Sequence, residues 1–496
     1  MVWRCAKVEC SRRRAPKLAS AMTTTHKISV LAAAILFIAD NVGTGILALP
    51  GQAEALGGRT GGVALIIVFA PLCWYVAIAL HRAAMLVERR DAELLASDGA
   101  RPLINDLYGL AAALYSPNAC IALVTAFLYY STLFLQMASY LIVLSQALQK
   151  IVGALVPFCR PWAGLATALL LLVSNQLPSM AAVARGPAGL SVLGVVAVVV
   201  ICVTFAAKTA AAPLVPPSPP PSRSPFETAL DRGAAVGGVI FAEAVTMLLL
   251  NSRQALREPN RVGTALAIAL SGMCIGFTAV VVCSGPHPPP FLLDAIPHGE
   301  PSWQRVASSL LFVHVAISYA ISSVALCTAI QRLPLLRRRG ASGTGGKQPS
   351  SSSSSDGMAG APAGIDVVLS DENRVVNGSE ATAAASSSCW RERLEWACLT
   401  SVVMLMAWLL ANAAPFFAAL VDFIGSLNLC TFFLPCLFLR RAHHLTRTPL
   451  PLWEKALTAI LMLASVAMTF VGCSGSIFGI VRSWRHYGVP FACHAV

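Results

Sequence analysis

Residues 40–51, with the sequence DNVGTGILALPG, place an acid, an amide, three glycines and a proline inside an apolar stretch. Glycine and proline interrupt helices, and a helix break at membrane depth exposes backbone groups that only a protein-lined cavity can satisfy. The exposed N–H groups of one half-helix attract an anion, and the unwound carbonyls of the other bind a cation. We therefore expect a broken helix that forms part of a binding site.

Within this segment, Gly43, Thr44 and Gly45 would present N–H groups to a substrate carboxylate, because glycine lets a ligand approach the backbone. Asn41 and the Thr44 hydroxyl would orient that carboxylate. Small residues at this spacing also allow membrane helices to pack closely. Packing alone does not require Asp40 and Asn41 beside them, so we favour a substrate site.

Three acids, Asp40, Glu243 and Asp422, lie within apolar stretches, where an ionised side chain costs about 2.5–3.5 kcal/mol. They should face the interior of a helix bundle. If Asp40 and Glu243 approach each other, one of them can hold a proton and act as its carrier. Alternatively, the acids accept hydrogen bonds from neighbouring helices or unwound backbone and never change charge, which is the interpretation we favour for Asp422.

Further candidate site residues lie in two other apolar stretches. Phe241 and Thr246 could form the pocket for a substrate side chain, and Ser318 and Ser322 could supply oxygen ligands to a coupling ion. His314 could relay protons, although a lone histidine inside a membrane is commonly a hydrogen-bonded structural residue. The cysteines form no CxxC pair and no Cys/His cluster with metal-ligand spacing, and we expect neither a metal site nor a cofactor.

Composition identifies the environment of the chain. Of its 496 residues, 56% are hydrophobic and only 12% charged, whereas about a quarter of residues are charged in a soluble domain. We predict an all-α polytopic membrane protein, with spans of roughly 20 residues each. Eleven spans are expected, near residues 28–50, 61–85, 118–146, 163–183, 188–210, 233–252, 262–284, 303–331, 393–414, 416–439 and 453–480.

Lysine and arginine predict the orientation, because cytosolic loops are enriched in them. With the N-terminus in the cytosol, the cytosolic segments hold 27 of the 36 basic residues. The net charge of +13 therefore reflects the orientation of the chain in the membrane. A nucleic-acid-binding protein would gather its charge on one folded face, so the expected partners are the lipid bilayer and a small substrate, with no nucleic acid.

Changes in composition divide the chain. The loop at 340–388 is poor in large apolar residues and should be disordered, and Pro213 to Pro225 should be extended polyproline. Cys159 and Cys283 lie near loops on the predicted non-cytosolic side, where they could form a disulfide. The expected units are a basic cytosolic tail at 1–27, a first five-helix repeat at 28–210, a Pro-rich linker at 211–232, a second five-helix repeat at 233–439 with a disordered loop at 333–392, and an eleventh helix with the C-terminal tail at 440–496.

Three patches resemble the amino acid/auxin permease family. Residues 40–51 are similar to its first helix, with Asn, a Gly-x-Gly cluster and Leu-Pro. Residues 237–261 (GGVIFAEAVTMLLLNSRQALREPNR) resemble its sixth helix, and residues 415–439, which open with Pro-Phe-Phe, resemble its tenth. Residues 41–45 look most like the proton-coupled branch of the family. Sodium-coupled members tend to carry their Asn further upstream, where this chain has Ala39.

The resemblance implies a LeuT-like fold of two inverted five-helix repeats with broken first and sixth helices. It also implies transport of amino acids, or of relatives such as auxin or polyamines, driven by protons or sodium. The sixth helix departs from many relatives at Glu243 to Thr246, which makes the substrate pocket unusual. The protein would lie in the plasma membrane or in a vacuolar or lysosomal membrane.

We therefore expect a secondary active transporter that moves small neutral amino acids with protons by alternating access. The alternative is an amino-acid sensor that binds without transport and signals through its cytosolic segments. A membrane-embedded enzyme would need a paired nucleophile and base or a metal set at depth, and the sequence shows neither.

Overall fold

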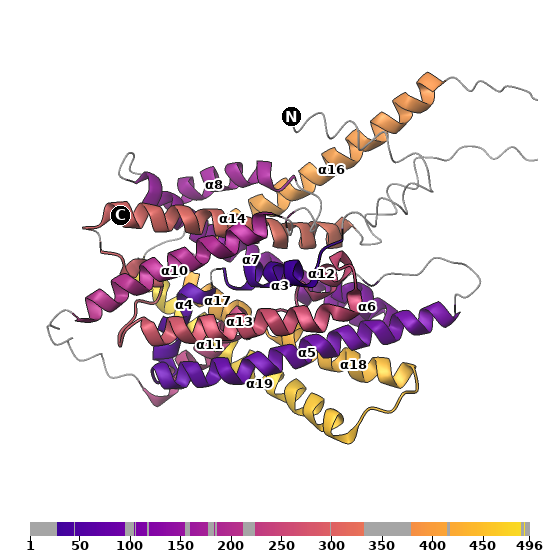
Figure 1. Cartoon of the computed structure of the whole chain (residues 1–496), viewed down its shortest axis with the longest axis horizontal. Coiled ribbons are helices and arrows are strands. Elements are labelled where there is room, and N and C mark those ends of the chain that lie inside the picture. Colours follow the sequence, from indigo (N-terminus) through magenta and orange to yellow (C-terminus); the bar gives the residue numbers. More distant parts are fainter. Residues whose placement is uncertain are drawn as a thin grey trace, which may run out of the picture.

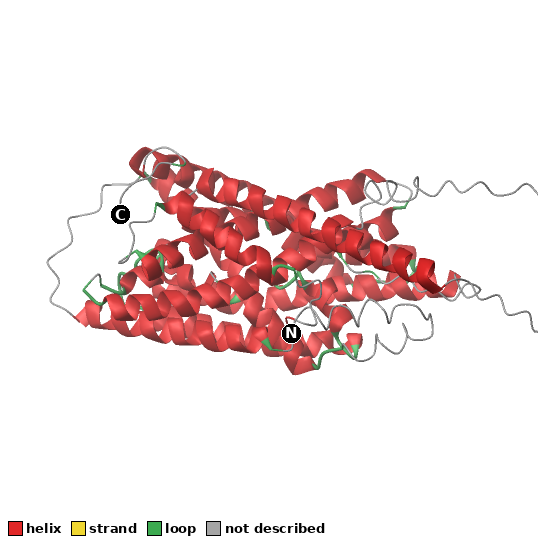
Figure 2. Ribbon diagram, turned by 90° about the horizontal axis from the view of Figure 1, so that it is seen from above, coloured by secondary structure: helices red, strands yellow, loops and turns green. Residues whose placement is uncertain are grey.

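The computed structural model describes residues 27–43, 45–94, 104, 106–116, 119–153, 159–176, 183, 186–211, 224–297, 299–331, 378–413, 417–487 and 491. Within these ranges every regular element is helical, and the single β-bridge joins Ile28 to Leu256 (Figure 2). Eight helical spans are long and apolar enough to cross a membrane, and a bent pair of helices makes a ninth. The prediction of an all-α membrane protein is confirmed.

The described helices follow the predicted spans closely. Those that cross as continuous or nearly continuous spans are α5 (Arg59–Leu94), α7 (Ala119–Val152), α10 (Pro187–Ala211), α13 (Val262–Cys283), α14 (Pro301–Gln331), α16 (Gly378–Ala413), α19 (Leu452–Tyr487), and the series α17 (Phe417–Ser426), η3 (Leu429–Phe433) and α18 (Leu434–Leu445). The helix α8 (Arg160–Ser174) is shorter than the predicted fourth span. The segment η3 is a π-helix, a wider turn that often occurs at functional sites.

Two spans are broken, as the resemblance implies. The first consists of α3 (Val30–Asn41) and α4 (Gly45–Ala55), which meet at an angle of 57°. The sixth consists of α11 (Pro225–Glu243) and α12 (Leu249–Ala255), with a non-helical stretch at 244–248. In Figure 1 the helices α3, α4, α11 and α17 lie in the middle of the molecule, while α8, α16 and α19 lie toward its edges.

Glycines set the spacing between α11 and α17 in this central group. A Cβ on Gly425 of α17 would collide with the carbonyl oxygen of Gly237 on α11, and would stand 2.9 Å from the Cβ of Phe241. A Cβ on Gly238 would collide with Gln52 and Asp422. The two backbones therefore touch, which holds the broken sixth span against the tenth.

Three features differ from the sequence predictions. The helix α11 begins at Pro225, inside the predicted linker, because Ser224 caps it and exchanges hydrogen bonds with Glu227 in a capping box. The helix α16 begins at Gly378, inside the predicted disordered loop, since alanine favours helix even where few large apolar residues are present. A short helix, α6 (Leu107–Tyr115), capped by Asp106, was not predicted.

The possible disulfide between Cys159 and Cys283 is not formed. Cys283 is a free, exposed thiol, whereas Cys159 is disulfide-bonded. The partner of Cys159 lies outside the described residues, as do residues 1–26 of the predicted tail and most of the predicted linker and disordered loop. Both cysteines lie at span ends, so sequence position alone did not distinguish them.

The contact between α11 and α17 predicts the effect of adding one methyl group. Gly425→Ala should destabilise the protein by about 1–3 kcal/mol, because overpacking forces the two backbones apart. The measurement is the thermal unfolding midpoint of the purified protein in detergent. The matched control is Gly276→Ala on α13, where a Cβ would have no described neighbour within 4 Å. Equal midpoints for the two variants would contradict this description of the contact.

Candidate substrate site

The last carbonyls of α3 have no partners within the helix, because a helix end leaves such acceptors unpaired. Side chains supply the missing bonds. The Ser318 hydroxyl on α14 donates to the Ala39 carbonyl at 2.8 Å. The Asn41 side-chain amide donates to the Phe37 carbonyl, one turn earlier, at 2.9 Å. The Tyr140 hydroxyl on α7 donates to the Asp40 carbonyl at 3.2 Å. Two neighbouring spans therefore hold the broken end in place.

Asp40 is buried at this end of α3, with 4% of its surface exposed. Its carboxylate accepts a hydrogen bond from the Ser322 hydroxyl at 3.4 Å. Tyr140, which binds the Asp40 carbonyl, accepts in turn from the Gln136 amide at 2.6 Å. The structure thus brings together Asp40, Ser318 and Ser322, three of the predicted ion-coupling residues, around the end of one half-helix.

The break in the sixth span is also held by a tyrosine of α7. The Tyr129 hydroxyl donates to the Met247 carbonyl at 3.0 Å and accepts from the Asn251 amide at 3.5 Å. Within the break, the Val245 N–H donates to the Glu243 carbonyl at 2.9 Å. The helix α7 therefore braces both breaks, one through Tyr140 and the other through Tyr129.

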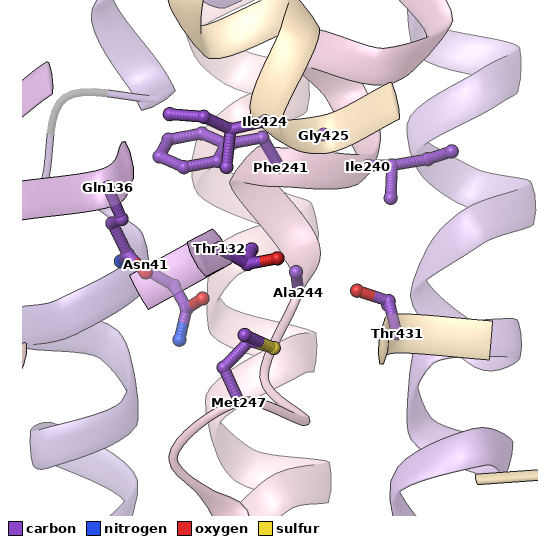
Figure 3. A pocket seen from close by; sticks show the side chains of 10 residues that line it. All are labelled: Asn41, Thr132, Gln136, Ile240, Phe241, Ala244, Met247, Ile424, Gly425 and Thr431. Atoms are coloured by element: carbon purple, nitrogen blue, oxygen red, sulfur yellow. The ribbon is translucent and has the colours of Figure 1, made fainter. Parts of the chain in front are cut away.

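A small cavity lies between the two breaks (Figure 3). Phe241 and Ile424 lie together at one end of it and Met247 at the other, while the hydroxyls of Thr132 and Thr431 point inward from opposite sides. None of the described residues that line the cavity is charged. They are Asn41, Thr132, Gln136, Ile240, Phe241, Ala244, Met247, Ile424, Gly425 and Thr431.

Two of the predicted substrate-binding residues, Asn41 and Phe241, line this cavity. Thr132 and Gln136 were not predicted, although their spacing of four places both on one face of α7. Polar residues repeated at that spacing in an apolar span are the pattern that could have identified them. Thr431 carried no such pattern, because its position follows from the π-turn of η3.

The other predicted substrate residues lie around the cavity without lining it. Gly45 packs against α11, since a Cβ there would stand 3.1 Å from the Cα and Cβ of Ala242. Gly43 faces α14. Thr246 is buried, and its hydroxyl has no partner among the described residues. Thr44 lies outside the described residues.

The acids Asp40 and Glu243 face different spans, and no described interaction joins them. Glu243 is 1% exposed, and neither carboxylate oxygen has a hydrogen-bond partner among the described residues. It lies near the thiols of Cys73 on α5 and Cys274 on α13. The expectation that the two acids share a site therefore finds no support in their contacts.

Asp422 has the hydrogen-bonding role that the sequence favoured. Its carboxylate accepts from the Gln52 amide at 2.8 Å, which joins α4 to α17. Gly238 of α11 leaves room for this pair, because a side chain there would displace it. The cavity-lining residues Ile424 and Gly425 follow Asp422 on α17. The pair thus joins α4 to α17 beyond the cavity, on the predicted non-cytosolic side.

Contacts at the opposite end tie the two half-helices α3 and α12 together. The Ile28 N–H donates to the Ala255 carbonyl at 2.8 Å, and the Arg257 N–H donates to the Ile28 carbonyl at 3.0 Å. Beside this bridge, buried Arg253 of α12 forms an ion pair with Glu88 of α5. The cavity therefore lies between two sets of interhelical ties.

Membrane-length apolar helices, two spans of which break around a buried polar cavity, define a polytopic membrane transporter. The family model described as transmembrane amino acid transporter protein matches residues 26–483. The chain belongs to this family, which confirms the resemblance seen in the sequence. A search of curated protein sequences finds no match.

A solved structure supports the same fold. The chain resembles the crystal structure of MhsT in complex with L-phenylalanine, with a TM-score of 0.50 and 13% identity over 91% of this chain and 98% of that one. That likeness supports the LeuT-like fold. A manganese transporter from Eremococcus coleocola, crystallised with an aromatic bis-isothiourea compound, matches at 11% identity and a TM-score of 0.34 over 91% and 94% of the chains.

The bracing of the sixth-span break can be tested with two tyrosines. Tyr129→Phe leaves the buried Met247 carbonyl without its donor and should cost about 1–3 kcal/mol. The control is Tyr319→Phe, because the buried Tyr319 hydroxyl has no partner among the described residues and its loss should be neutral or stabilising. Thermal unfolding midpoints of both variants measure the difference. A Tyr319→Phe variant that is the less stable of the two would contradict the assignment.

Proposed function

We propose that this protein is a secondary active transporter that moves small neutral amino acids together with protons. The observation that carries the proposal is the meeting of two helix breaks at one buried, uncharged, polar cavity. In such an arrangement the backbone groups freed by the breaks bind the charged ends of a zwitterion, and side chains decide what else fits.

The substrate carboxylate would lie against the N-terminus of α4, where the first N–H groups have no helical partner. The substrate ammonium would lie against the carbonyl ends of α3 and α11, with the Thr132 and Thr431 hydroxyls and the Asn41 amide as further partners. An uncharged lining offers no counter-ion for a charged substrate side chain, which favours a neutral amino acid. Phe241, Ile424 and Met247 would limit its size.

The cavity of about 20 Å³ holds about one water molecule, so an amino acid requires the surrounding helices to move apart. The ties at the two ends are the natural points of opening: Gln52 with Asp422 on one side, and the Ile28 bridge with Arg253 and Glu88 on the other. Opening one end while the other stays closed is alternating access. The inverted five-helix repeats and the cytosolic N-terminus belong to the same proposal.

Buried acids without a cationic partner support proton coupling. A carboxylate in a membrane interior is costly unless it is paired or protonated. Among the described residues, the Ser322 hydroxyl is the partner of the Asp40 carboxylate, and Glu243 has none. Changes in helix packing that expose either acid to water would allow a proton to enter or leave. The plasma membrane and the vacuolar or lysosomal membrane both maintain a proton gradient that could drive such a cycle.

Flux in proteoliposomes tests the proposal. The purified protein should accumulate a labelled neutral amino acid under an inward proton gradient, and much less under an inward sodium gradient or none. Asp40→Asn and Glu243→Gln should each reduce this accumulation at least tenfold, because the amide cannot carry a proton. The control is Glu300→Gln, a change in the exposed segment before α14. Substrate binding without flux under all three conditions would instead identify a sensor.

The cavity itself predicts a size effect. Ala244→Leu places a larger side chain where the sixth span breaks and should abolish uptake of all but the smallest amino acids, such as glycine. Competition by unlabelled amino acids of increasing size measures the change in selectivity. Ala320→Leu, on α14 and outside the cavity lining, serves as the matched control. An unchanged order of competition in Ala244→Leu would place the substrate elsewhere.

A further inference from the structure

His314 on α14 is a fully buried histidine close to the break in the first span. Its Nδ1 lies 3.0 Å from the Ser191 carbonyl oxygen and 2.6 Å from the Ser191 hydroxyl on α10. We assign the proton to Nδ1, because the Ser191 carbonyl oxygen can only accept a hydrogen bond. In the neutral ring, Nε2 is therefore a bare acceptor.

This bare nitrogen faces the break in the first span. A Cβ on Gly43 would stand 3.3 Å from Nε2, 3.5 Å from the Ser318 hydroxyl and 3.5 Å from the Asp40 carbonyl oxygen. Nε2 has no hydrogen-bond partner among the described residues. The unpaired basic nitrogen thus packs closely against the backbone at Gly43, where no side chain intervenes.

One feature beside Nε2, the end of α3, favours a positive charge at this point. The carbonyl end of α3 carries the negative end of the helix dipole, and Asp40 lies in its last turn. From α7, the Tyr140 hydroxyl reaches the same helix end, and α10 contributes Ser191. Other ionisable groups lie on elements that contact α14, but no described interaction joins them to His314. The 3-10 turn η2 (Leu292–Ala295) is one of these elements. The groups are Cys202 and Lys208 of α10, Lys150 of α7, Arg160 of α8, Asp294 of η2, and Arg393, Glu395 and Cys398 of α16.

We infer that His314 receives a coupling proton at Nε2 when the carbonyl end of α3 lies against it. The inference rests on the proposed function and names the group on α14 that senses the position of α3. When the end of α3 lies against α14, an imidazolium at His314 is balanced by the carbonyl end of that helix. When the half-helix moves away, that balance is lost and the proton leaves. Proton binding would then be linked to the position of the broken helix.

The test separates proton coupling from substrate binding. His314→Asn keeps a donor near the position of Nδ1 and removes the base at Nε2. In proteoliposomes, proton-driven accumulation should fall at least tenfold, and its pH dependence should flatten. Substrate exchange without a gradient should stay within about twofold of the wild-type rate. Accumulation with the wild-type magnitude and pH profile would overturn the inference.

Two controls exclude a merely structural role for the ring. Ser191→Ala removes the hydroxyl partner of Nδ1 but leaves Nε2 in place, so coupled uptake should persist. A loss equal to that of His314→Asn would assign the effect to ring placement and overturn the inference. His444→Asn, in the last turn of α18, should leave uptake unchanged. Thermal shifts on substrate addition show that each variant still binds.

A measurement on the wild-type protein does not depend on the folding of any variant. In protein labelled with ¹⁵N-histidine, the Nε2 signal of His314 should change from the bare to the protonated value over the pH range in which uptake rises. A signal that stays bare throughout that range would overturn the inference. Absence of any proton-driven uptake by the wild-type protein would instead refute the proposed function itself, and the inference with it.

Discussion

The constraint on which this structure depends is the cost of an unpaired backbone group inside a membrane. Each broken span frees carbonyl and N–H groups at a depth where water cannot replace the lost helical bonds. Hydroxyls and amides from neighbouring helices form hydrogen bonds with these freed groups. Tyr140 and Ser318 bind the carbonyls at the end of α3, and Tyr129 binds one in the break of the sixth span.

The same bonds explain why the site lies where it does. The helix α7 contributes a donor to each break and, on the same helix, Thr132 and Gln136 to the cavity. Positions near the breaks are therefore determined by a rigid span outside them, and the freed groups that remain are available to a ligand. Close contact between α11 and α17 at Gly237 and Gly425 holds the remaining wall. The same helix thus braces both breaks and supplies polar groups to the cavity.

Part of this arrangement could be predicted from the sequence. The glycines and proline of residues 40–51 indicated the first break, and apolar stretches located the spans, because both are local properties. The break at 244–248 contains neither glycine nor proline, so it followed only from the family resemblance. Which helices meet is not encoded locally: Tyr140 binds Asp40 across 100 residues and Asp422 binds Gln52 across 370. Asn41 and Phe241 could therefore be identified from the segments that contain them. Thr431 could not, because its place at the cavity depends on contacts between distant segments.

The parallel bridge between Ile28 and Leu256 has a consequence for the energy of opening. Its two backbone hydrogen bonds lie at the end of the spans, where water can replace them, so each contributes about 0.5–1.5 kcal/mol. Together they would favour the joined state of the two half-helices by a factor of about 5 to 150. In the proposed transport cycle, such a bias would keep that end closed for most of the time and would still allow it to open thermally in every cycle. The bridge would then act as a reversible closure of the two half-helices.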